Sequence, residues 1–375
     1  MTEQVEKILG ETSVETFTTV ARGVLEDPTA SLAETPNFNE ITVDHNDKRT
    51  IGLFIVTGEA LSSGKQQSWS AVLKLIDPSE TVGSGLIESE LQVYESGIFS
   101  SDAVPFRSAK FYHSESLDNG MLTLWLEDLS ESPQPPWNLE QFTTAANHIG
   151  QFNGYHYLNK TEVPFDILSN RFVDRLNMLD FRSDAVRLVE EHNSTAIRAA
   201  YSSTPVETAT RIAELTTQLI EVGKSLPHSL AFGDSHPRNL FPVESGTVGI
   251  DWGTTTMDPI GADAGMLTGP SLTLGIDEAN LIIQNERAIF ESYVGGLSAS
   301  GWSGDQNDVR LGYLCSFINF LNAVNSFLVN IPNYESRREW VERRLKAPFD
   351  EIPNLMSPIV AEFPKYADEL EQLLN

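Results

Sequence analysis

The sequence has little cysteine and few basic residues, and both shortages exclude classes of protein. A single cysteine, Cys315, rules out an internal disulfide. Because Cys315 lies in the apolar stretch 314–320, we interpret it as a buried core residue rather than a nucleophile. Lys and Arg total 25 against 53 Asp and Glu, a formal net charge of −28. A general nucleic-acid binder needs a basic face to neutralise phosphates, so this charge argues against one.

The acidity itself has two interpretations. It serves solubility or adaptation to high salt, which we favour, or it draws cationic substrates to an acidic cleft. Apolar residues make up 40% of the chain and charged residues 21%, as in globular proteins rather than disordered ones. A chain of 375 residues is long enough for two lobes, each with its own core.

Long apolar runs are also missing. No run approaches the roughly 18–20 residues that a bilayer-spanning helix requires. The start of the chain, Met1-Thr2-Glu3-Gln4, lacks the basic and apolar segments of a secretion signal. We therefore expect no membrane partner and a cytoplasmic location. The sequence does not indicate an oligomeric state.

The pattern of apolar residues changes along the chain. Four short stretches rich in Val, Ile and aromatic residues predict strands at 39–43, 51–57, 69–76 and 121–129. Apolar residues at helical spacing predict helices at 86–96, 139–158 and 308–330. The prediction is an α+β protein with a β-rich lobe over 1–127 and a helical lobe over 128–375, joined near 127–136.

One segment, 231–253, combines side chains suited to phosphoryl transfer. A loop presents Asp234 and Asn239 five residues apart, and a turn at 244–246 then precedes a short apolar strand that ends in Asp251. Transfer from a nucleotide needs a carboxylate that orients the attacking hydroxyl and accepts its proton. It also needs hard oxygen ligands that hold Mg²⁺ on the phosphates.

This segment resembles the motif of the aminoglycoside phosphotransferase and choline kinase superfamily, in particular a bacterial branch of unassigned substrate. The superfamily's catalytic loop usually reads His-Gly-Asp-x-His-x-x-Asn, followed by Ile-Asp-Trp or Ile-Asp-Phe. The resemblance implies that Asp234 is the catalytic base, that His236 is a structural or substrate-orienting member of the catalytic loop, and that Asn239 and Asp251 bind Mg²⁺. Phe232 replaces the usual first histidine, which is often architectural, so the reacting groups stay intact.

Two further tracts extend the resemblance. Asp258-Pro259 and Asp263 are similar to the downstream Asp-Pro…Asp element, in which the aspartate helps to brace the catalytic loop. The tract 137–158, with Phe152-Asn153-Gly154, resembles bacterial members but indicates no chemistry.

In the β-rich lobe, Lys74 lies inside the apolar run 71–76, where an unpaired lysine is costly to bury. The resemblance implies that Lys74 binds nucleotide phosphates and pairs with an acid on the next helix. Glu88 and Glu90 are candidates, and Glu90 fits the family's helix better. The alternative is an edge-strand lysine that reaches solvent.

The stretch 124–129 resembles the family's Leu-Glu-Asp-Leu hinge. The resemblance implies that the backbone at Leu126, Glu127 and Asp128 binds adenine. The usual glycine-rich phosphate loop is missing, since 45–50 would replace it with only Gly52 nearby. Gly58…Gly64-Lys65 has the wrong spacing for a P-loop, and we predict a flexible hairpin turn there.

Together the resemblance implies a protein-kinase-like two-lobed fold, with an antiparallel sheet in the first lobe. The implied activity is an enzyme that transfers the γ-phosphoryl group of ATP, or of GTP, to a hydroxyl of a small molecule. The acceptor would be aminoglycoside-, choline- or sugar-like, and its site would lie at 263–280 and 308–330. An acidic pocket would favour a cation and a neutral one a sugar or another natural-product hydroxyl.

A protein acceptor is disfavoured, because no Ala-Pro-Glu element follows and the segment from Asp251 to Asp258-Pro259 is too short for an activation loop. Two alternatives stay open. One is a catalytically silent kinase-fold protein that binds nucleotide or ligand. The other is an unrelated α+β protein with a chance motif.

Overall fold

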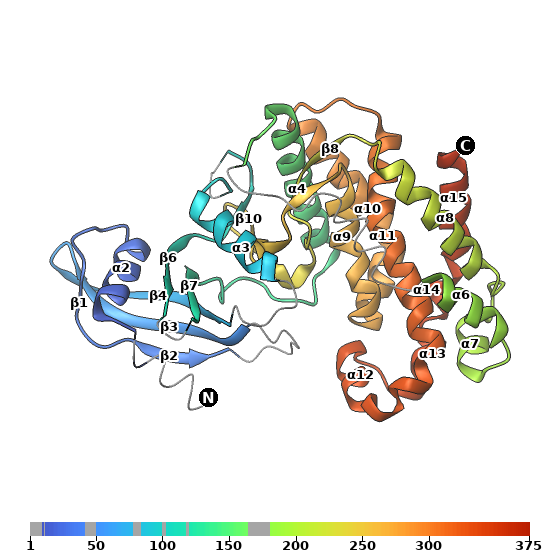
Figure 1. The fold of residues 1–375 in the computed structure, drawn as a ribbon, viewed down its shortest axis with the longest axis horizontal. Helices are drawn as coiled ribbons and strands as arrows, with labels where there is room; N and C mark the ends of the chain where they lie inside the picture. The colour runs from blue at the N-terminus through green and yellow to red at the C-terminus, as the bar shows by residue number, and fades with distance from the viewer. Residues whose placement is uncertain are drawn as a thin grey trace. The chain divides into compact units, whose positions relative to one another are not determined.

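The computed structural model describes residues 10, 12–41, 50–77, 84–99, 103–117, 120–163 and 181–375, with backbone only for 84–89. The chain forms two compact units (Figure 1). The first comprises 1–101 and 107–132, and the second 102–106 and 133–375. An antiparallel sheet dominates the first unit and helices dominate the second, which confirms the predicted α+β class.

The first unit is built on one antiparallel sheet. Its strand order is β1 (Ser31–Leu32), β3 (Thr50–Ser62), β4 (Lys65–Ile76), β7 (Leu122–Glu127) and β6 (Phe111–Ser116), and β2 (Asn37–Glu40) also pairs with β3. The strands predicted at 51–57, 69–76 and 121–129 correspond to β3, β4 and β7. The predicted strand at 39–43 overlaps β2, and its last two residues lie outside the described ones. Ser63 and Gly64, both at positive φ, form the β3–β4 turn, so the predicted hairpin is confirmed.

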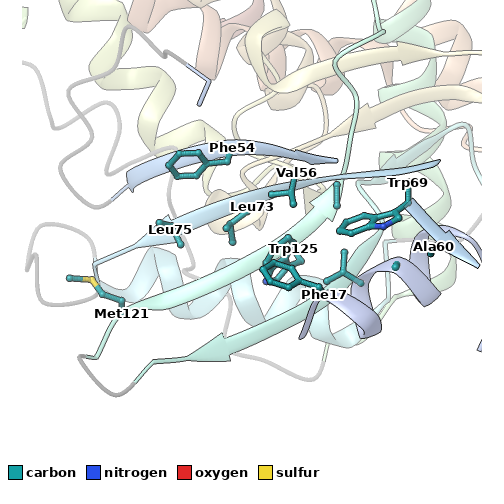
Figure 2. Close-up of a cluster of buried hydrophobic side chains, with 12 residues drawn as sticks. Phe17, Phe54, Val56, Ala60, Trp69, Leu73, Leu75, Met121 and Trp125 are labelled. Carbon is teal, nitrogen blue, oxygen red and sulfur yellow. The ribbon is translucent and has the colours of Figure 1, made fainter. Parts of the chain in front are cut away.

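The core of the first unit lies between one face of this sheet and helix α2 (Val14–Val24) (Figure 2). Alternate residues of a strand point to the same face. For this reason β3 contributes Phe54 and Val56, and β4 contributes Trp69 and Leu73. The ring of Phe17 on α2 meets Trp125 of β7 edge-on at 5.8 Å. Helix α3 (Ser84–Ser96) also belongs to this unit, where 86–96 was predicted to be helical.

The second unit is mainly helical. Among the described residues its α-helices are α4 (Leu139–Asn159), α6 (Phe181–Glu190), α7 (Thr195–Ala200), α8 (Thr208–Gly223), α9 (Ala262–Thr268), α10 (Ile276–Ala299), α11 (Gln306–Val329), α12 (Arg338–Leu345), α13 (Ile352–Leu355), α14 (Ser357–Ala361) and α15 (Phe363–Leu374). The helices predicted at 139–158 and 308–330 are α4 and α11. Two short antiparallel pairs interrupt the helices: β8 (His228–Ala231) with β11 (Thr256–Pro259), and β9 (Leu240–Val243) with β10 (Gly246–Gly249). Strand β5 (Phe106–Ser108) pairs with β10.

Helix α11 is the core helix of the second unit. The expectation that no stretch is long and apolar enough to cross a bilayer is wrong for this helix: among the described residues it alone meets that criterion, although 72% of the qualifying stretch is buried inside the protein. Such burial is expected of a helix surrounded by other helices. Cys315 lies on α11 and is 1% exposed, and burial raises the pKa of its thiol. The prediction that Cys315 is a buried core residue is confirmed.

The Phe17 contact gives a stability prediction. Phe17→Ala should destabilise the protein by about 3 kcal/mol, because a buried aromatic ring is lost and a cavity is left. Val14→Ala on the same helix is the control, since Val14 is 72% exposed and its truncation should cost less than about 0.5 kcal/mol. Urea unfolding followed by tryptophan fluorescence measures both. Equal midpoints for the two variants would show that α2 does not stabilise the sheet.

Candidate functional site

The predicted catalytic loop begins directly after β8 and ends at β9. Its first turn depends on Gly233, which has φ +84°. A Cβ at this position would lie 2.3 Å from the carbonyl oxygen of Thr254, so only glycine fits here. The loop closes in a short 3₁₀ helix, Pro237–Asn239, which leads into β9.

Asp234 is fixed by two other residues of the predicted motif. Asn239 donates from Nδ2 to Asp234 Oδ2 at 2.9 Å and to the Asp234 carbonyl at 3.2 Å. The Nδ1 atom of His236 accepts the Arg238 N–H at 3.2 Å, so the neutral ring has its proton on Nε2. That Nε2 lies 3.6 Å from Asp234 Oδ1. Asn239 is buried, whereas 32% of the Asp234 side chain is exposed.

Asp251 lies two residues beyond the end of the β9–β10 hairpin, in which Leu240 pairs with Gly249. The two residues that flank this last strand pair also stay together, because the Ile250 N–H donates to the Asn239 carbonyl at 3.0 Å. Asp251 has φ 60° and ψ 50°, a left-handed conformation that is uncommon for a residue with a Cβ and that recurs at functional sites. Asp251 therefore comes directly after Ile250, the residue whose N–H is bonded to the Asn239 carbonyl.

The donor atoms at this end of the hairpin suit a hard cation. With Nδ2 of Asn239 turned to Asp234, its Oδ1 is the atom that a cation would meet. Within the described part of the chain no group of three or more His, Cys, Asp or Glu side chains is arranged to hold a metal alone. Two oxygen ligands that share Mg²⁺ with substrate phosphates are a common arrangement, so Asn239 and Asp251 fit the predicted ion.

Asp263, at the start of α9, holds the loop from behind. This buried carboxylate accepts the Gly233 N–H at 2.8 Å and the Phe232 N–H at 2.9 Å, and its carbonyl accepts the Ser235 hydroxyl at 2.5 Å. Asn153 adds a third N–H donor at 3.0 Å. Burial raises the pKa of Asp263, while these donors pull it down. The predicted bracing of the catalytic loop by this aspartate is confirmed.

Sequence reasoning missed the role of Asn153. Its Nδ2 donates to the Leu230 carbonyl at 2.9 Å as well as to Asp263, and its Oδ1 accepts the Tyr293 hydroxyl at 2.8 Å. Tyr293 in turn accepts the Gly261 N–H at 2.9 Å. Helices α4 and α10 therefore both support the loop. A polar residue beside the apolar positions of a long helix was the available signal, because buried polar groups need partners.

Phe232, at the position of the motif's usual histidine, packs among aromatic rings. Its ring lies 4.6 Å from Trp252 and 5.6 Å from Phe106, and its side chain is fully buried. Phe152 of α4 meets Phe106 edge-on at 5.1 Å. The departure from the motif is therefore accommodated by packing, and the backbone N–H of Phe232 still reaches Asp263.

In the first unit, the predicted ion pair is present. Lys74 Nζ lies 3.0 Å from both carboxylate oxygens of Glu90, and the two side chains are 14% and 8% exposed. The alternative of an edge-strand lysine is wrong, because β4 lies between β3 and β7 in the sheet. A buried lysine of this kind depends on its carboxylate partner. The side chain of the other candidate, Glu88, lies outside the described ones.

The predicted hinge, 124–129, begins within β7 and extends two residues beyond it, and side chains hold it in place. Arg107 donates to both carboxylate oxygens of Glu127, at 2.7 and 2.9 Å, and lowers its pKa although burial opposes this. The Glu127 N–H donates to the Lys110 carbonyl at 2.9 Å, so adenine would have to meet other backbone groups. Asp128 accepts the Ser130 N–H, and Leu126 is buried. Adenine binding here stays a prediction, and 45–49 of the phosphate-loop candidates lie outside the described residues.

Removing Asn153 should weaken the support of the loop. Asn153→Ala should cost about 2 kcal/mol, because Asp263 and the Leu230 carbonyl lose a donor in a buried environment. Loss of that donor raises the folded-state pKa of Asp263 further above its ordinary 3.8. The native state then binds more protons than the unfolded state, so the destabilisation should grow as the pH rises above about 4.

Thermal unfolding of both proteins between pH 4 and 8 measures this effect. Asn159→Ala is the control on the same helix, since its exposed side chain bonds only locally, to the Tyr155 carbonyl. A destabilisation by Asn153→Ala that shrinks with rising pH would contradict a role for Asn153 in holding an ionised Asp263.

Comparisons with known proteins identify the fold. No protein-family model and no curated protein sequence matches the chain. The crystal structure of choline kinase from Cryptosporidium parvum Iowa II matches with TM-score 0.52 and 13% identity, covering 99% of this chain and 100% of that one. Amicoumacin kinase hAmiN, in complex with AMP-PNP, Ca²⁺ and Ami, matches with TM-score 0.50 and 10% identity, covering 97% and 96%. The chain therefore has the protein-kinase-like two-lobed fold of these small-molecule kinases.

Proposed function

We propose that this protein is an ATP-dependent small-molecule kinase in which Asp234 is the catalytic base. The observation that carries the proposal is the arrangement of Asp234, Asn239 and His236 at the head of a loop held by Asp263. Side chains of these types at this spacing suit phosphoryl transfer, and the fold is one that choline kinase and amicoumacin kinase share. Use of ATP favours the cytoplasmic location that the sequence predicts.

The chemistry assigned to Asp234 follows from its contacts. Asn239 fixes Oδ2, so Oδ1 faces the acceptor hydroxyl and His236 Nε2. The acceptor oxygen forms a bond to the γ-phosphorus while the bond from that phosphorus to the β,γ-bridging oxygen breaks. The acceptor proton passes to Asp234, and ADP leaves. Most of the rate enhancement comes from positioning and electrostatics.

The nucleotide contacts are divided among the remaining predicted residues. Asn239 Oδ1 and Asp251 would hold Mg²⁺, which neutralises charge on the phosphates when bound. Lys74, oriented by its ion pair with Glu90, would bind the phosphates. Backbone groups at 126–128 would bind the base. GTP stays an alternative to ATP.

A catalytically silent relative is the competing interpretation. The absent glycine-rich loop is the feature that favours it. Two features oppose it: Asp234, Asn239 and Asp251 are all present, and Glu90 and Asp263 hold their partners in place. A protein that no longer transfers phosphate has no need to keep these groups aligned.

The first test is transfer itself. Wild-type protein with ATP and Mg²⁺ should phosphorylate one or more members of a panel of hydroxylated small molecules, detected by ³¹P NMR. Asp234→Asn should lower kcat by about 10²- to 10⁴-fold, because proton acceptance is lost, and should leave the Kd for ATP within about threefold. Glu214→Gln, at an exposed acid on α8, is the control and should behave as wild type. Full activity in Asp234→Asn would sink the assignment.

The second test concerns the cation. Asp251→Asn should weaken ATP binding in the presence of Mg²⁺ by about tenfold or more and should change binding in EDTA little, because the carboxylate acts through the ion. Isothermal titration calorimetry of ATP binding with and without Mg²⁺ measures both affinities. Equal Mg²⁺ dependence in wild type and Asp251→Asn would contradict the role of Asp251.

A further inference from the structure

The two aspartates of the proposed reaction lie on separate segments of the second unit. Asp234 belongs to the segment 232–239, which we name the base loop, and Asp251 begins the segment 251–254, which we name the cation turn. Phosphoryl transfer requires the acceptor and the cation to meet the same phosphate, so the relative position of the two segments matters. Each contact that joins the base loop to the cation turn therefore bears on catalysis.

A short strand pair brings the two segments together. Strand β8 runs directly into the base loop, and β11 follows the cation turn. The last residue of β8, Ala231, lies opposite Thr256, and the pairing ends there. Beyond it the chain turns into the base loop, since Gly233 has φ +84°. The backbone groups just past the end of the pair need other partners, because buried backbone groups are nearly always hydrogen-bonded.

Thr254 supplies such a partner. Its hydroxyl donates to the carbonyl of Phe232, a buried residue, at 3.0 Å. The backbones also lie close together here, because a Cβ at Gly233 would be 2.3 Å from the Thr254 carbonyl oxygen. This hydrogen bond therefore links a residue two positions before Asp234 to a residue three positions after Asp251.

A second joint lies at the other end of the base loop. The N–H of Ile250, directly before the cation turn, donates to the Asn239 carbonyl at 3.0 Å, and Asn239 Nδ2 holds Asp234 Oδ2. The base loop is thus tied to the neighbourhood of Asp251 at both of its ends. The joint at Asn239 is made by backbone groups, whereas the joint at Thr254 is made by a side chain, so a substitution can remove it.

The Thr254 hydrogen bond matters more for geometry than for folding. Trp252 already anchors the cation turn in the core: its side chain is fully buried, its ring lies 4.6 Å from that of Phe232, and its Nε1 donates to the Gly249 carbonyl at 2.8 Å. One uncharged hydrogen bond adds little to stability beside this packing. A displacement of a reacting group by about 1 Å, by contrast, can lower a rate about 10²-fold.

We propose that Thr254 is a positioning residue, which fixes the cation turn to the base loop and thereby sets the distance between Asp251 and Asp234. The hydroxyl acts through the Phe232 carbonyl and contacts neither substrate. This inference rests on the proposed kinase function, because it concerns the geometry of that same reaction.

Four variants of the whole protein separate this role from general stabilisation. Thr254→Val removes the hydroxyl and keeps the branched shape, Thr254→Ala removes it without placing a methyl group against the carbonyl, and Thr254→Ser restores the donor. Thr255→Val is the matched control at the next residue. The Thr255 hydroxyl donates to the Trp252 carbonyl at 2.7 Å, and the Thr255 N–H, at 3.0 Å, keeps that carbonyl bonded when the hydroxyl is lost.

Thermal unfolding measures the stability of each variant. Thr254→Val and Thr255→Val should both fold and should lose similar stability, because each lacks one uncharged hydrogen bond. Loss of the fold in both Thr254→Val and Thr254→Ala would overturn the proposal, because the bond would then stabilise the fold itself.

Transfer from ATP with Mg²⁺ is measured on an acceptor that the wild type phosphorylates. Thr254→Val and Thr254→Ala should lower kcat about ten- to hundredfold and raise the Mg²⁺ concentration that gives half the maximal rate, because Asp251 is no longer held to the base loop. The KM for the acceptor should stay within about threefold, and Thr254→Ser and Thr255→Val should behave as wild type. Unchanged kcat in Thr254→Val, an equal loss in Thr255→Val, no rescue by Thr254→Ser, or a raised acceptor KM at normal kcat would each overturn the proposal.

Hydrogen exchange examines the same joint without nucleotide or acceptor. In mass spectrometry of peptides from 232–239 and 250–255, exchange should be about fivefold faster in Thr254→Val than in the wild type, whereas Thr255→Val should leave 232–239 unchanged. If the wild type transfers no phosphate, the kinase function fails, and this measurement decides the inference separately. Faster exchange in both segments supports a joint made by Thr254, and unchanged exchange overturns it.

Discussion

The site depends on a buried carboxylate that accepts two successive backbone N–H groups. Asp263 holds the N–H groups of Phe232 and Gly233, and this places Asp234 at the exposed end of a rigid turn. Ionising a buried carboxyl is costly unless donors surround it. Helix α4 supplies such a donor through Asn153, and α10 orients that donor through Tyr293. The helices thus position the proposed base without contacting it.

The same rule governs the first unit. Lys74 is buried on a central strand and is matched by both oxygens of Glu90, and Glu127 is matched by Arg107. In each case a charge is retained in a poorly solvated position because a partner of opposite sign meets it in good geometry. Such paired charges hold a side chain in one orientation, which is what the binding of phosphates and of a nucleotide base requires.

Much of this was predictable from the sequence, because it depends on local patterns. Strand periodicity located β3 and β4, helical periodicity located α4 and α11, and motif spacing brought Asp234 and Asn239 together. The features that the sequence did not predict depend on contacts between residues far apart in sequence. Asn153 and Tyr293 meet across 140 positions, and nothing in either segment signals the other. The ion pair that Arg107 forms with Glu127 of the predicted hinge is likewise a tertiary contact. The packing of Phe232 at the position of the motif's usual histidine is another.

The central claim is that Asn239 and Asp251 hold the cation that accompanies the nucleotide at Asp234. A crystal structure with AMP-PNP and Mn²⁺, in which anomalous scattering locates the metal, tests this most directly. The account predicts a manganese peak within coordination distance of both Asn239 Oδ1 and an Asp251 carboxylate oxygen. A nucleotide bound with its metal away from both side chains would contradict the account.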